Sequence, residues 1–186
     1  MIKKLYHGTK AYFDGPDLKK SKNFKDFGKG FYLTTNLEQA MKWAARKLPN
    51  NDKRYTAYVY EYEFNTNNTE ELNVLELLEY NKECQDYITP NRHEGEKEIV
   101  YDLVYDRMAD STGDELATNI ELYWHNEKSA EEVLRAIKFK NEKFDQYCFK
   151  TPKAVACLRR VRYAELFKLD RKPKILKWYK EGEKYE

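Results

Sequence analysis

Residues 26–48 have the sequence DFGKGFYLTTNLEQAMKWAARKL, and the predicted fold is organised around them. Gly28 and Gly30 lie on either side of Lys29. Glycine permits positive φ angles and close approach of a backbone to a ligand, so this pair predicts a tight loop. The loop is expected to lead into a short strand over residues 30–34.

A helix is predicted directly after this strand. Thr35 and Glu38 fit the capping box, in which each side chain satisfies a backbone amide at the helix start. One helical stripe is apolar and must face a core: Leu37, Ala40, Met41, Ala44 and Leu48. Trp43 lies off that stripe and follows the strand that carries Tyr32. Two rings that face each other across a slot can bind a flat heterocycle between them.

The second feature lies near the N-terminus, where residues 3–7 have the character of a strand. Leu5 and His7 would lie on one face of this strand and Tyr6 on the other. Gly8 follows His7 directly. Such a pair can offer a ring nitrogen, a backbone amide and a carbonyl to one ligand.

These motifs together resemble the ADP-ribosyltransferase superfamily. The match consists of YHGT at residues 6–9, GKGFYLT at residues 28–34, and a helical aromatic eleven residues after the tyrosine. The branch resembled is the His-Tyr-Glu one, shared by diphtheria-toxin-like toxins and poly(ADP-ribose) polymerases, and within it an uncharacterised bacterial toxin-like subfamily. The resemblance covers residues 5–161. It implies an α+β fold of two facing antiparallel sheets, with surrounding helices and an NAD cleft.

The resemblance also implies NAD as the substrate and no metal. His7 would donate to a ribose hydroxyl, and the Gly8 backbone would hold the nicotinamide carboxamide. Tyr32 and Trp43 would stack on the two faces of the nicotinamide ring. The implied catalytic residues are His7, Tyr32 and Gln146, and the implied NAD contacts are His7, Gly8, Thr9, Gly30, Phe31, Tyr32, Ala40 and Trp43.

Gln146 departs from the pattern of the relatives, whose third catalytic residue is a glutamate on a late strand. The matching strand here is FDQYCF at residues 144–149. Glutamine can hydrogen-bond a ribose hydroxyl, but it is uncharged and is a negligible base. Loss of one preorganised stabiliser typically costs ~10²–10³ in rate, so mono-transfer at most is expected. Asp110, Glu94 or the substrate itself are the alternative sources of a base.

The activity implied is transfer of one ADP-ribose from NAD to a macromolecule (RNA, DNA or protein), with release of nicotinamide. The setting implied is the toxin of a bacterial toxin–antitoxin or phage-defence system, with an antitoxin protein as partner. Two alternatives stay open because of Gln146. One is a catalytically inactive module that binds NAD or ADP-ribose, and the other is a NAD glycohydrolase that uses water as acceptor.

The composition predicts a single domain over residues 1–168 of the 186-residue chain, followed by a basic C-terminal extension over residues 169–186. Lys and Arg number 34 and Asp and Glu 32, so the net charge is +2. This excludes a nucleic-acid binder that works by bulk charge, although a local basic groove stays open. The basic loop at residues 18–25 is either solvated or meets a pyrophosphate or polyanion.

The three cysteines lack metal-ligand spacing, which indicates reduced thiols. No apolar segment follows Lys3 and Lys4, and nothing approaches a bilayer span, so a cytoplasmic protein without membrane contact is expected. The acidic run Glu94, Glu96 and Glu98 is predicted to be a solvated face without a metal site.

The remaining elements follow from periodicity and turn chemistry. The alternating segment 55–64 predicts an edge or half-exposed strand. Further strands are expected at 74–77, 99–105, 146–149 and 161–168, and further helices at 78–88, 116–124, 130–137 and 151–159. A second capping box is expected at Ser129 and Glu132.

Overall fold

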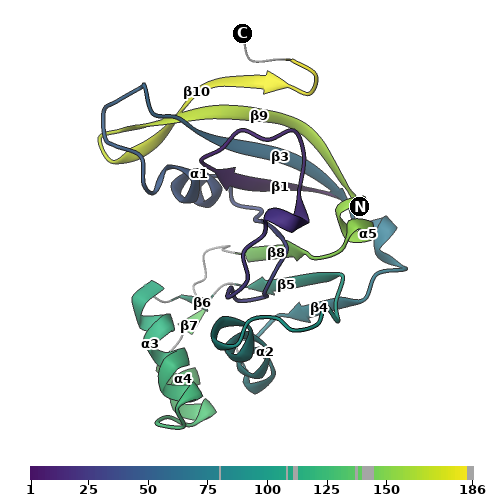
Figure 1. Ribbon diagram of the computed structural model, residues 1–186, viewed down its shortest axis with the longest axis vertical. Coiled ribbons are helices and arrows are strands. Elements are labelled where there is room, and N and C mark those ends of the chain that lie inside the picture. The colour runs from purple at the N-terminus through teal and green to yellow at the C-terminus, as the bar shows by residue number, and fades with distance from the viewer. Residues whose placement is uncertain (80, 108, 111–112, 137, 140–144, 184–186) are drawn as a thin grey trace. The chain divides into compact units, whose positions relative to one another are not determined.

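The computed structural model describes residues 1–79, 81–107, 109–110, 113–136, 138–139 and 145–183. These residues form an α+β fold with two four-stranded sheets, a two-stranded pair and five α-helices (Figure 1). The chain divides into two compact units. The first unit comprises Met1–Pro16, Tyr32–Glu71 and Val155–Glu186, and the second comprises Asp17–Phe31 and Leu72–Ala154.

The first unit is an antiparallel sheet with one helix on it. The strand order is β1 (Ile2–Thr9), β3 (Ala57–Asn65), β9 (Leu158–Leu169) and β10 (Lys172–Lys180). Helix α1 (Leu37–Ala45) covers one face of this sheet (Figure 1). The core between them consists largely of small side chains: Ala40, Ala44, Ala57, Val59, Ala164 and Leu166. Because alanine projects so little, the helix backbone can approach the sheet closely.

The strand predicted over 55–64 is present as β3, but the expectation of an edge strand is wrong. β3 lies between β1 and β9. One face of β3 looked polar in the sequence because it carries Glu61, and Arg162 on the neighbouring strand β9 neutralises this carboxylate. Glu61 is 2% exposed and accepts hydrogen bonds from Arg162 Nε at 2.9 Å and Nη2 at 2.7 Å. Lys4 Nζ lies 3.6 Å from the other carboxylate oxygen. A buried carboxylate is tolerated where cations surround it in this way.

The second sheet is mixed, with the order β2 (Phe31–Leu33), β8 (Asp145–Phe149), β5 (Leu103–Arg107) and β4 (Val74–Leu77). Strands β8, β5 and β4 belong to the second unit, and the boundary between the units falls within β2. β5 and β8 are antiparallel, whereas β4 and β5 are parallel. The expectation of purely antiparallel sheets is therefore wrong here. Parallel neighbours need a long crossover, and residues 78–102, with helix α2 (Lys82–His93), provide it.

The helices begin at residues whose side chains accept from exposed backbone amides. Asn36 caps α1 by accepting from the Gln39 amide at 3.0 Å, so the box predicted at Thr35 and Glu38 is wrong by one residue. Asn81 caps α2 by accepting from the Cys84 amide at 3.0 Å. α2 therefore begins later than predicted, and it continues through Pro90 to His93.

Two further helices lie in the second unit, α3 (Gly113–Trp124) and α4 (Ala130–Ala136). The capping box at the start of α4 is confirmed. The Ser129 amide donates to Glu132 Oε2 at 2.8 Å, and the Glu132 amide donates to Ser129 Oγ at 3.3 Å. The short elements are η1 (Leu18–Lys20), η2 (Thr66–Thr69), β6 (Ala109–Asp110) and β7 (Lys138–Phe139).

The C-terminal part of the chain contributes to the first sheet. Helix α5 (Pro152–Val155) is a single turn, shorter than predicted, because Leu158 already pairs with Phe64 in the sheet. The strand predicted at 161–168 is confirmed within the longer β9. β9 turns at Asp170 and Arg171, both at positive φ, into β10. Residues 169–186, which were predicted to be a basic extension, thus supply the fourth strand of the first sheet.

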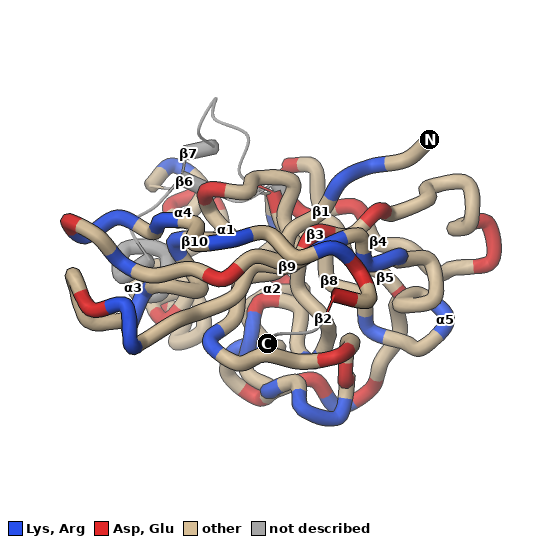
Figure 2. Tube along the Cα trace, turned by 90° about the horizontal axis from the view of Figure 1, so that it is seen from above, with Lys and Arg blue, Asp and Glu red and all other residues tan. Residues whose placement is uncertain are grey.

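Positive and negative side chains are interspersed along the chain (Figure 2). The three cysteines, Cys84, Cys148 and Cys157, are free and buried. Within the described residues, no helix combines the length and the apolar character that a membrane crossing requires.

Candidate functional site

His7 and Tyr32, one from each of the two motifs singled out in the sequence, both belong to the first unit. The Tyr6 amide donates to the Thr34 carbonyl at 2.7 Å, and the Thr34 amide donates back to Tyr6 at 3.0 Å. This bridge brings His7 beside Tyr32, and His7 Nδ1 lies 2.7 Å from the Tyr32 carbonyl oxygen. The Tyr6–Thr34 bridge fixes the backbone of Tyr32, and the Tyr32 carbonyl in turn orients the His7 imidazole ring.

The partner of Nδ1 determines the tautomer of His7. A carbonyl oxygen only accepts hydrogen bonds, so Nδ1 carries the proton. In the neutral ring Nε2 is then an acceptor. The expectation that His7 donates to a ribose hydroxyl stays a prediction, and with Nδ1 bonded to Tyr32 such a donation from Nε2 requires the protonated ring.

Gly8 is required by the close approach of helix α1. Gly8 is buried, and a Cβ atom at this position would overlap the Ala40 carbonyl oxygen and lie 3.2 Å from the Ala44 Cβ. Ala40 is 3% exposed and packs in the core. Of the residues expected to contact NAD, Gly8 and Ala40 thus form the junction between β1 and α1.

A further residue, Phe13, lies against His7 and was not found by sequence reasoning. Its ring centroid is 5.6 Å from that of His7 in an edge-to-face arrangement. The Phe13 amide donates to the Tyr60 hydroxyl at 2.9 Å, and Arg160 Nη1 donates to the Phe13 carbonyl at 3.1 Å. Burial raises the pKa of the Tyr60 hydroxyl. Both backbone polar groups of Phe13 therefore hold the loop of residues 10–16 beside His7.

Tyr32 and Trp43 belong to the first unit as well. Tyr32 is half-buried on β2, whereas Trp43 is 64% exposed on α1, as its position off the apolar stripe predicted. The Arg46 guanidinium carbon lies 4.7 Å from the Trp43 ring centroid. Thr9 ends β1, and its hydroxyl accepts from the Ala11 amide at 3.3 Å.

The other predicted residues lie in the second unit. Gln146 is half-buried on β8 and is paired with Asp106 on β5. Its neighbour Tyr147 is 3% exposed and points to the opposite face by strand alternation. Of the two alternative bases, Glu94 is exposed and paired with Lys97, and the Asp110 side chain lies outside the described residues.

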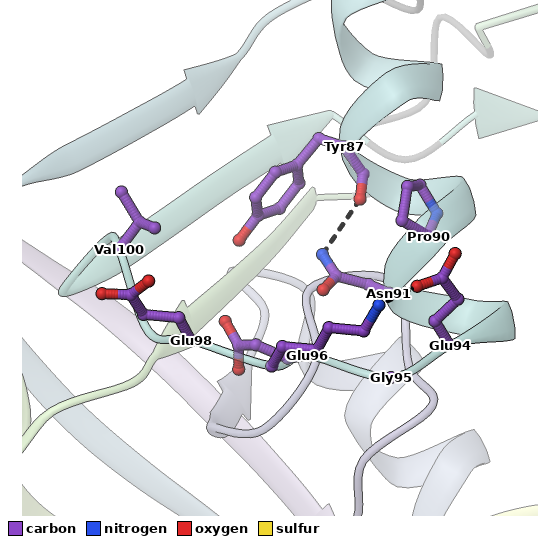
Figure 3. Close-up of a pocket in the computed structure, with 9 residues that line it drawn as sticks. Tyr87, Pro90, Asn91, Glu94, Gly95, Glu96, Glu98 and Val100 are labelled. Carbon is purple, nitrogen blue, oxygen red and sulfur yellow. Dashed lines mark hydrogen bonds and ion pairs between the residues drawn. The ribbon is translucent and has the colours of Figure 1, made fainter.

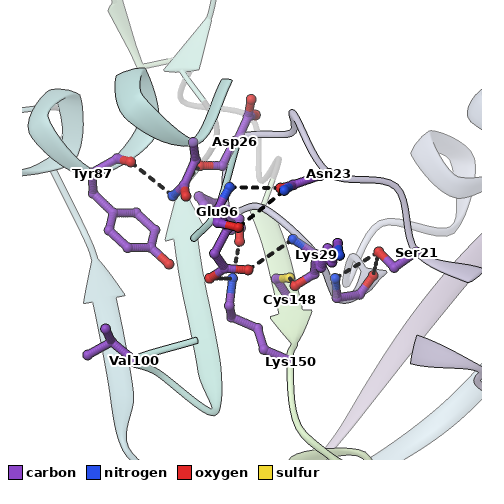
Figure 4. Close-up of polar contacts among 12 residues, drawn as sticks. Ser21, Asn23, Asp26, Lys29, Tyr87, Glu96, Val100, Cys148 and Lys150 are labelled. Carbon is purple, nitrogen blue, oxygen red and sulfur yellow. Dashed lines mark hydrogen bonds and ion pairs between the residues drawn. The ribbon is translucent and has the colours of Figure 1, made fainter. Parts of the chain in front are cut away.

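Gly30 and Phe31 follow a loop that is anchored by Glu96 (Figure 4). Lys150 is fully buried, and its Nζ lies 2.6 Å from Glu96 Oε1 and donates to the Phe27 carbonyl. Glu96 Oε2 accepts from the Lys29 amide at 3.1 Å. The side chain of Glu96 is 6% exposed, so its prediction as part of a solvated face is wrong.

Gly28 and Gly30 complete this loop. Gly28 has a φ of +68°, and a Cβ there would lie 2.6 Å from the Glu96 side chain, so glycine is required on both counts. The Gly30 amide and carbonyl both bond to the Ser21 hydroxyl, at 2.8 and 2.9 Å. Asn23 adds two bonds to the Glu96 backbone, at 2.8 and 3.2 Å. No sequence pattern indicated that Glu96 and Lys150 would meet.

A hollow of about 260 Å³ lies beside this network, between α2 and the segment 94–100 (Figure 3). Tyr87 and Asn91 line it from α2, and Glu96 and Glu98 line it from the segment. Drug-sized ligands fill roughly 300–1,000 Å³, so the hollow is too small for a whole dinucleotide.

The basic loop at 18–25 is largely solvated. Lys19, Lys20 and Lys22 are exposed, and Lys20 lies 3.7 Å from Asp17. Lys25 is half-buried, and burial lowers its pKa.

The described residues thus define an α+β protein in which the His7-Gly8 end of β1 packs against helix α1 and lies beside β2, the strand that carries Tyr32. The chain belongs to the family described as "Protein of unknown function (DUF3990)", whose model matches residues 3–160. No curated protein matches the chain, and no solved structure matches it either.

Proposed function

We propose that this protein is a mono-ADP-ribosyltransferase, which moves ADP-ribose from NAD to a macromolecular acceptor and releases nicotinamide. The observation that carries the proposal is the 2.7 Å hydrogen bond from His7 Nδ1 to the Tyr32 carbonyl. It joins the two motifs on which the resemblance to ADP-ribosyltransferases rests. We accordingly propose an ADP-ribosyltransferase-like fold for the α+β architecture.

The roles proposed for the first-unit residues follow from their geometry. His7 Nε2 accepts from a hydroxyl of the nicotinamide ribose, since Nδ1 is committed to Tyr32. The Gly8 backbone is proposed to bind the carboxamide. Trp43 is 64% exposed, and its ring is proposed to stack on a planar ligand. Thr9, Gly30 and Phe31 are proposed as further NAD contacts.

Gln146 is proposed for the third catalytic position. Its amide can hydrogen-bond a ribose hydroxyl but supplies no negative charge to an oxocarbenium-like centre. This favours transfer of a single ADP-ribose over chain elongation. No metal is needed for a reaction in which the leaving group is neutral nicotinamide. We further propose that the protein acts as the toxin of a bacterial toxin–antitoxin or phage-defence system, countered by an antitoxin protein.

The test is release of nicotinamide from NAD by the full chain in bacterial lysate, compared with His7→Ala. Loss of release with an unchanged melting temperature is expected. A lower melting temperature with full activity of the folded fraction would instead assign His7 a structural role. NAD binding without nicotinamide release would identify an inactive binding module, and release without transfer would identify a NAD glycohydrolase.

A further inference from the structure

A row of four rings crosses the first sheet from His7 to its edge. His7 on β1 pairs with Tyr60 on β3, Tyr60 with Tyr163 on β9, and Tyr163 with Tyr179 on β10. Directly paired residues of antiparallel strands point to the same face. This face is opposite α1, because Val59 and Ala164, which alternate with these rings, pack under the helix. The row spans three inter-strand spacings, about 14 Å.

Further tyrosine rings, which are partly exposed, pack against this row. Tyr60 and Tyr163 are almost fully buried, and the Tyr163 and Tyr179 rings stack with centroids 4.9 Å apart. Tyr12, 42% exposed, lies 5.4 Å from Tyr163 and 5.8 Å from Tyr58 between ring centroids. Tyr58 and Tyr179 are half-buried. The rings that solvent reaches are thus held by rings beneath or beside them.

Exposed lysines lie at the β10 end of this face. Lys177 Nζ is 4.7 Å from the Tyr179 ring centroid. Lys174 is exposed and pairs with Phe167, and Lys53 Nζ is 5.3 Å from that ring. Exposed lysines therefore lie beside aromatic rings at this end of the sheet.

Of the two carboxylates nearby, one is buried and the other is paired with an arginine. Glu165, which pairs with both Tyr58 and Lys177, is only 7% exposed. Glu181 receives a hydrogen bond from Arg160 Nη2 at 2.7 Å, together with one from Nε. What this face offers to a ligand is therefore exposed ring surface and positive charge.

We infer that this face, defined by Tyr12, Tyr58, Tyr179, Lys174 and Lys177, binds single-stranded nucleic acid as the acceptor of the transfer reaction. The inference rests on the proposed function. Stacking on aromatic rings combined with lysine contacts to phosphates is the chemistry by which proteins bind single strands. A duplex hides its bases in its own stack, and an acidic protein surface would use the lysines but not the rings. The exposed rings lie on the same face of the sheet as His7, where the ADP-ribosyl donor is proposed to bind.

The test is the fluorescence anisotropy of a labelled oligothymidylate of about fifteen nucleotides, titrated with the full chain over a series of salt concentrations. Tyr12→Ala is expected to weaken binding roughly 5- to 100-fold, whereas Tyr12→Phe, which keeps the ring, binds like wild type. Lys177→Ala is expected to reduce the slope of log K against log salt by about 0.7. Lys47→Ala, at an exposed lysine after α1, serves as the matched control and leaves the slope unchanged.

Calorimetry with NAD and assay with labelled NAD, run on the same preparations, separate the two proposals. Absent oligonucleotide binding at low salt, or equal affinity of wild type and Tyr12→Ala, overturns the nucleic-acid face even if NAD is bound. Equal affinity for the matching duplex overturns it too. Label transferred to lysate protein while the oligonucleotide stays unlabelled overturns the acceptor assignment. Label on the oligonucleotide that is lost in Tyr12→Ala, with nicotinamide release from NAD alone retained, is the expected result.

Discussion

Glu96→Gln is the substitution whose effect the structure defines most sharply. The change keeps the size of the side chain but removes the negative charge that faces Lys150 Nζ at 2.6 Å. Lys150 is fully buried and Glu96 is 6% exposed, so water cannot replace the lost partner without opening the loop. The backbone amide of Lys29 also loses the charge on its acceptor.

The expected cost is about 3–5 kcal/mol, the range for breaking a buried ion pair by removing one partner. At roughly 2–4 °C per kcal/mol for a chain of this size, the midpoint of thermal unfolding should fall by about 6–20 °C. Because Gly30 and Phe31 follow the loop that Glu96 anchors, NAD affinity should also fall. Glu98→Gln, two residues further on and exposed, is the matched control and should leave the midpoint unchanged.

Circular dichroism during heating measures this effect, and a double variant tests its cause. If the penalty arises from an unpaired buried ammonium, Glu96→Gln with Lys150→Met should be more stable than Glu96→Gln alone, since uncharged replacements of buried pairs are often neutral. A Glu96→Gln midpoint equal to that of Glu98→Gln would refute the assignment of the pair as the anchor of the loop.

Three further outcomes are expected. Trp43→Ala should keep the wild-type melting temperature, because Trp43 is 64% exposed, and should weaken NAD binding by about 0.5–1.5 kcal/mol in calorimetry. Asp102→Asn should remove an acid-dependent part of the stability. Burial alone would raise the pKa of Asp102, but hydrogen bonds from Lys153, the Asn73 amide and Thr151 hold it below its ordinary value. The carboxylate therefore stabilises the fold fully above the unfolded pKa of about 3.9, and this contribution is lost as pH falls through the lower folded pKa. Urea unfolding of wild type and variant should thus converge below about pH 4. Gln146→Glu should change the rate of NAD hydrolysis or of transfer in a product assay. Wild-type rates of both in Gln146→Glu and Gln146→Ala would remove Gln146 from the site.

The elements that follow from local patterns were predictable from the sequence. The strand over 161–168, the Ser129–Glu132 capping box and the position of Trp43 off the apolar stripe depend on residues a few positions apart, and all three are confirmed. The proximity of His7 to Tyr32 was anticipated only through the resemblance of their motifs. Periodicity alone gives no distance between them.

The features that sequence reasoning missed depend on partners far apart in the chain. Glu61 makes β3 look like an edge strand until Arg162 is placed opposite it. In the sequence Glu96 looks solvated, because its buried partner Lys150 comes several helices and strands later in the chain. The position of Phe13 beside His7 depends on the Tyr60 hydroxyl, which only strand pairing brings there. Charge pairing and register across a sheet leave no local signal.

Transfer of ADP-ribose is the central claim, and the most direct measurement uses NAD labelled in its adenylate part. The full chain and His7→Ala are incubated with this NAD and bacterial lysate, and the label is quantified in the separated RNA, DNA and protein. The proposal predicts covalent label in a macromolecular fraction with wild type and none with His7→Ala of equal melting temperature. Label confined to small molecules with wild type, or equal labelling by both proteins, would contradict it.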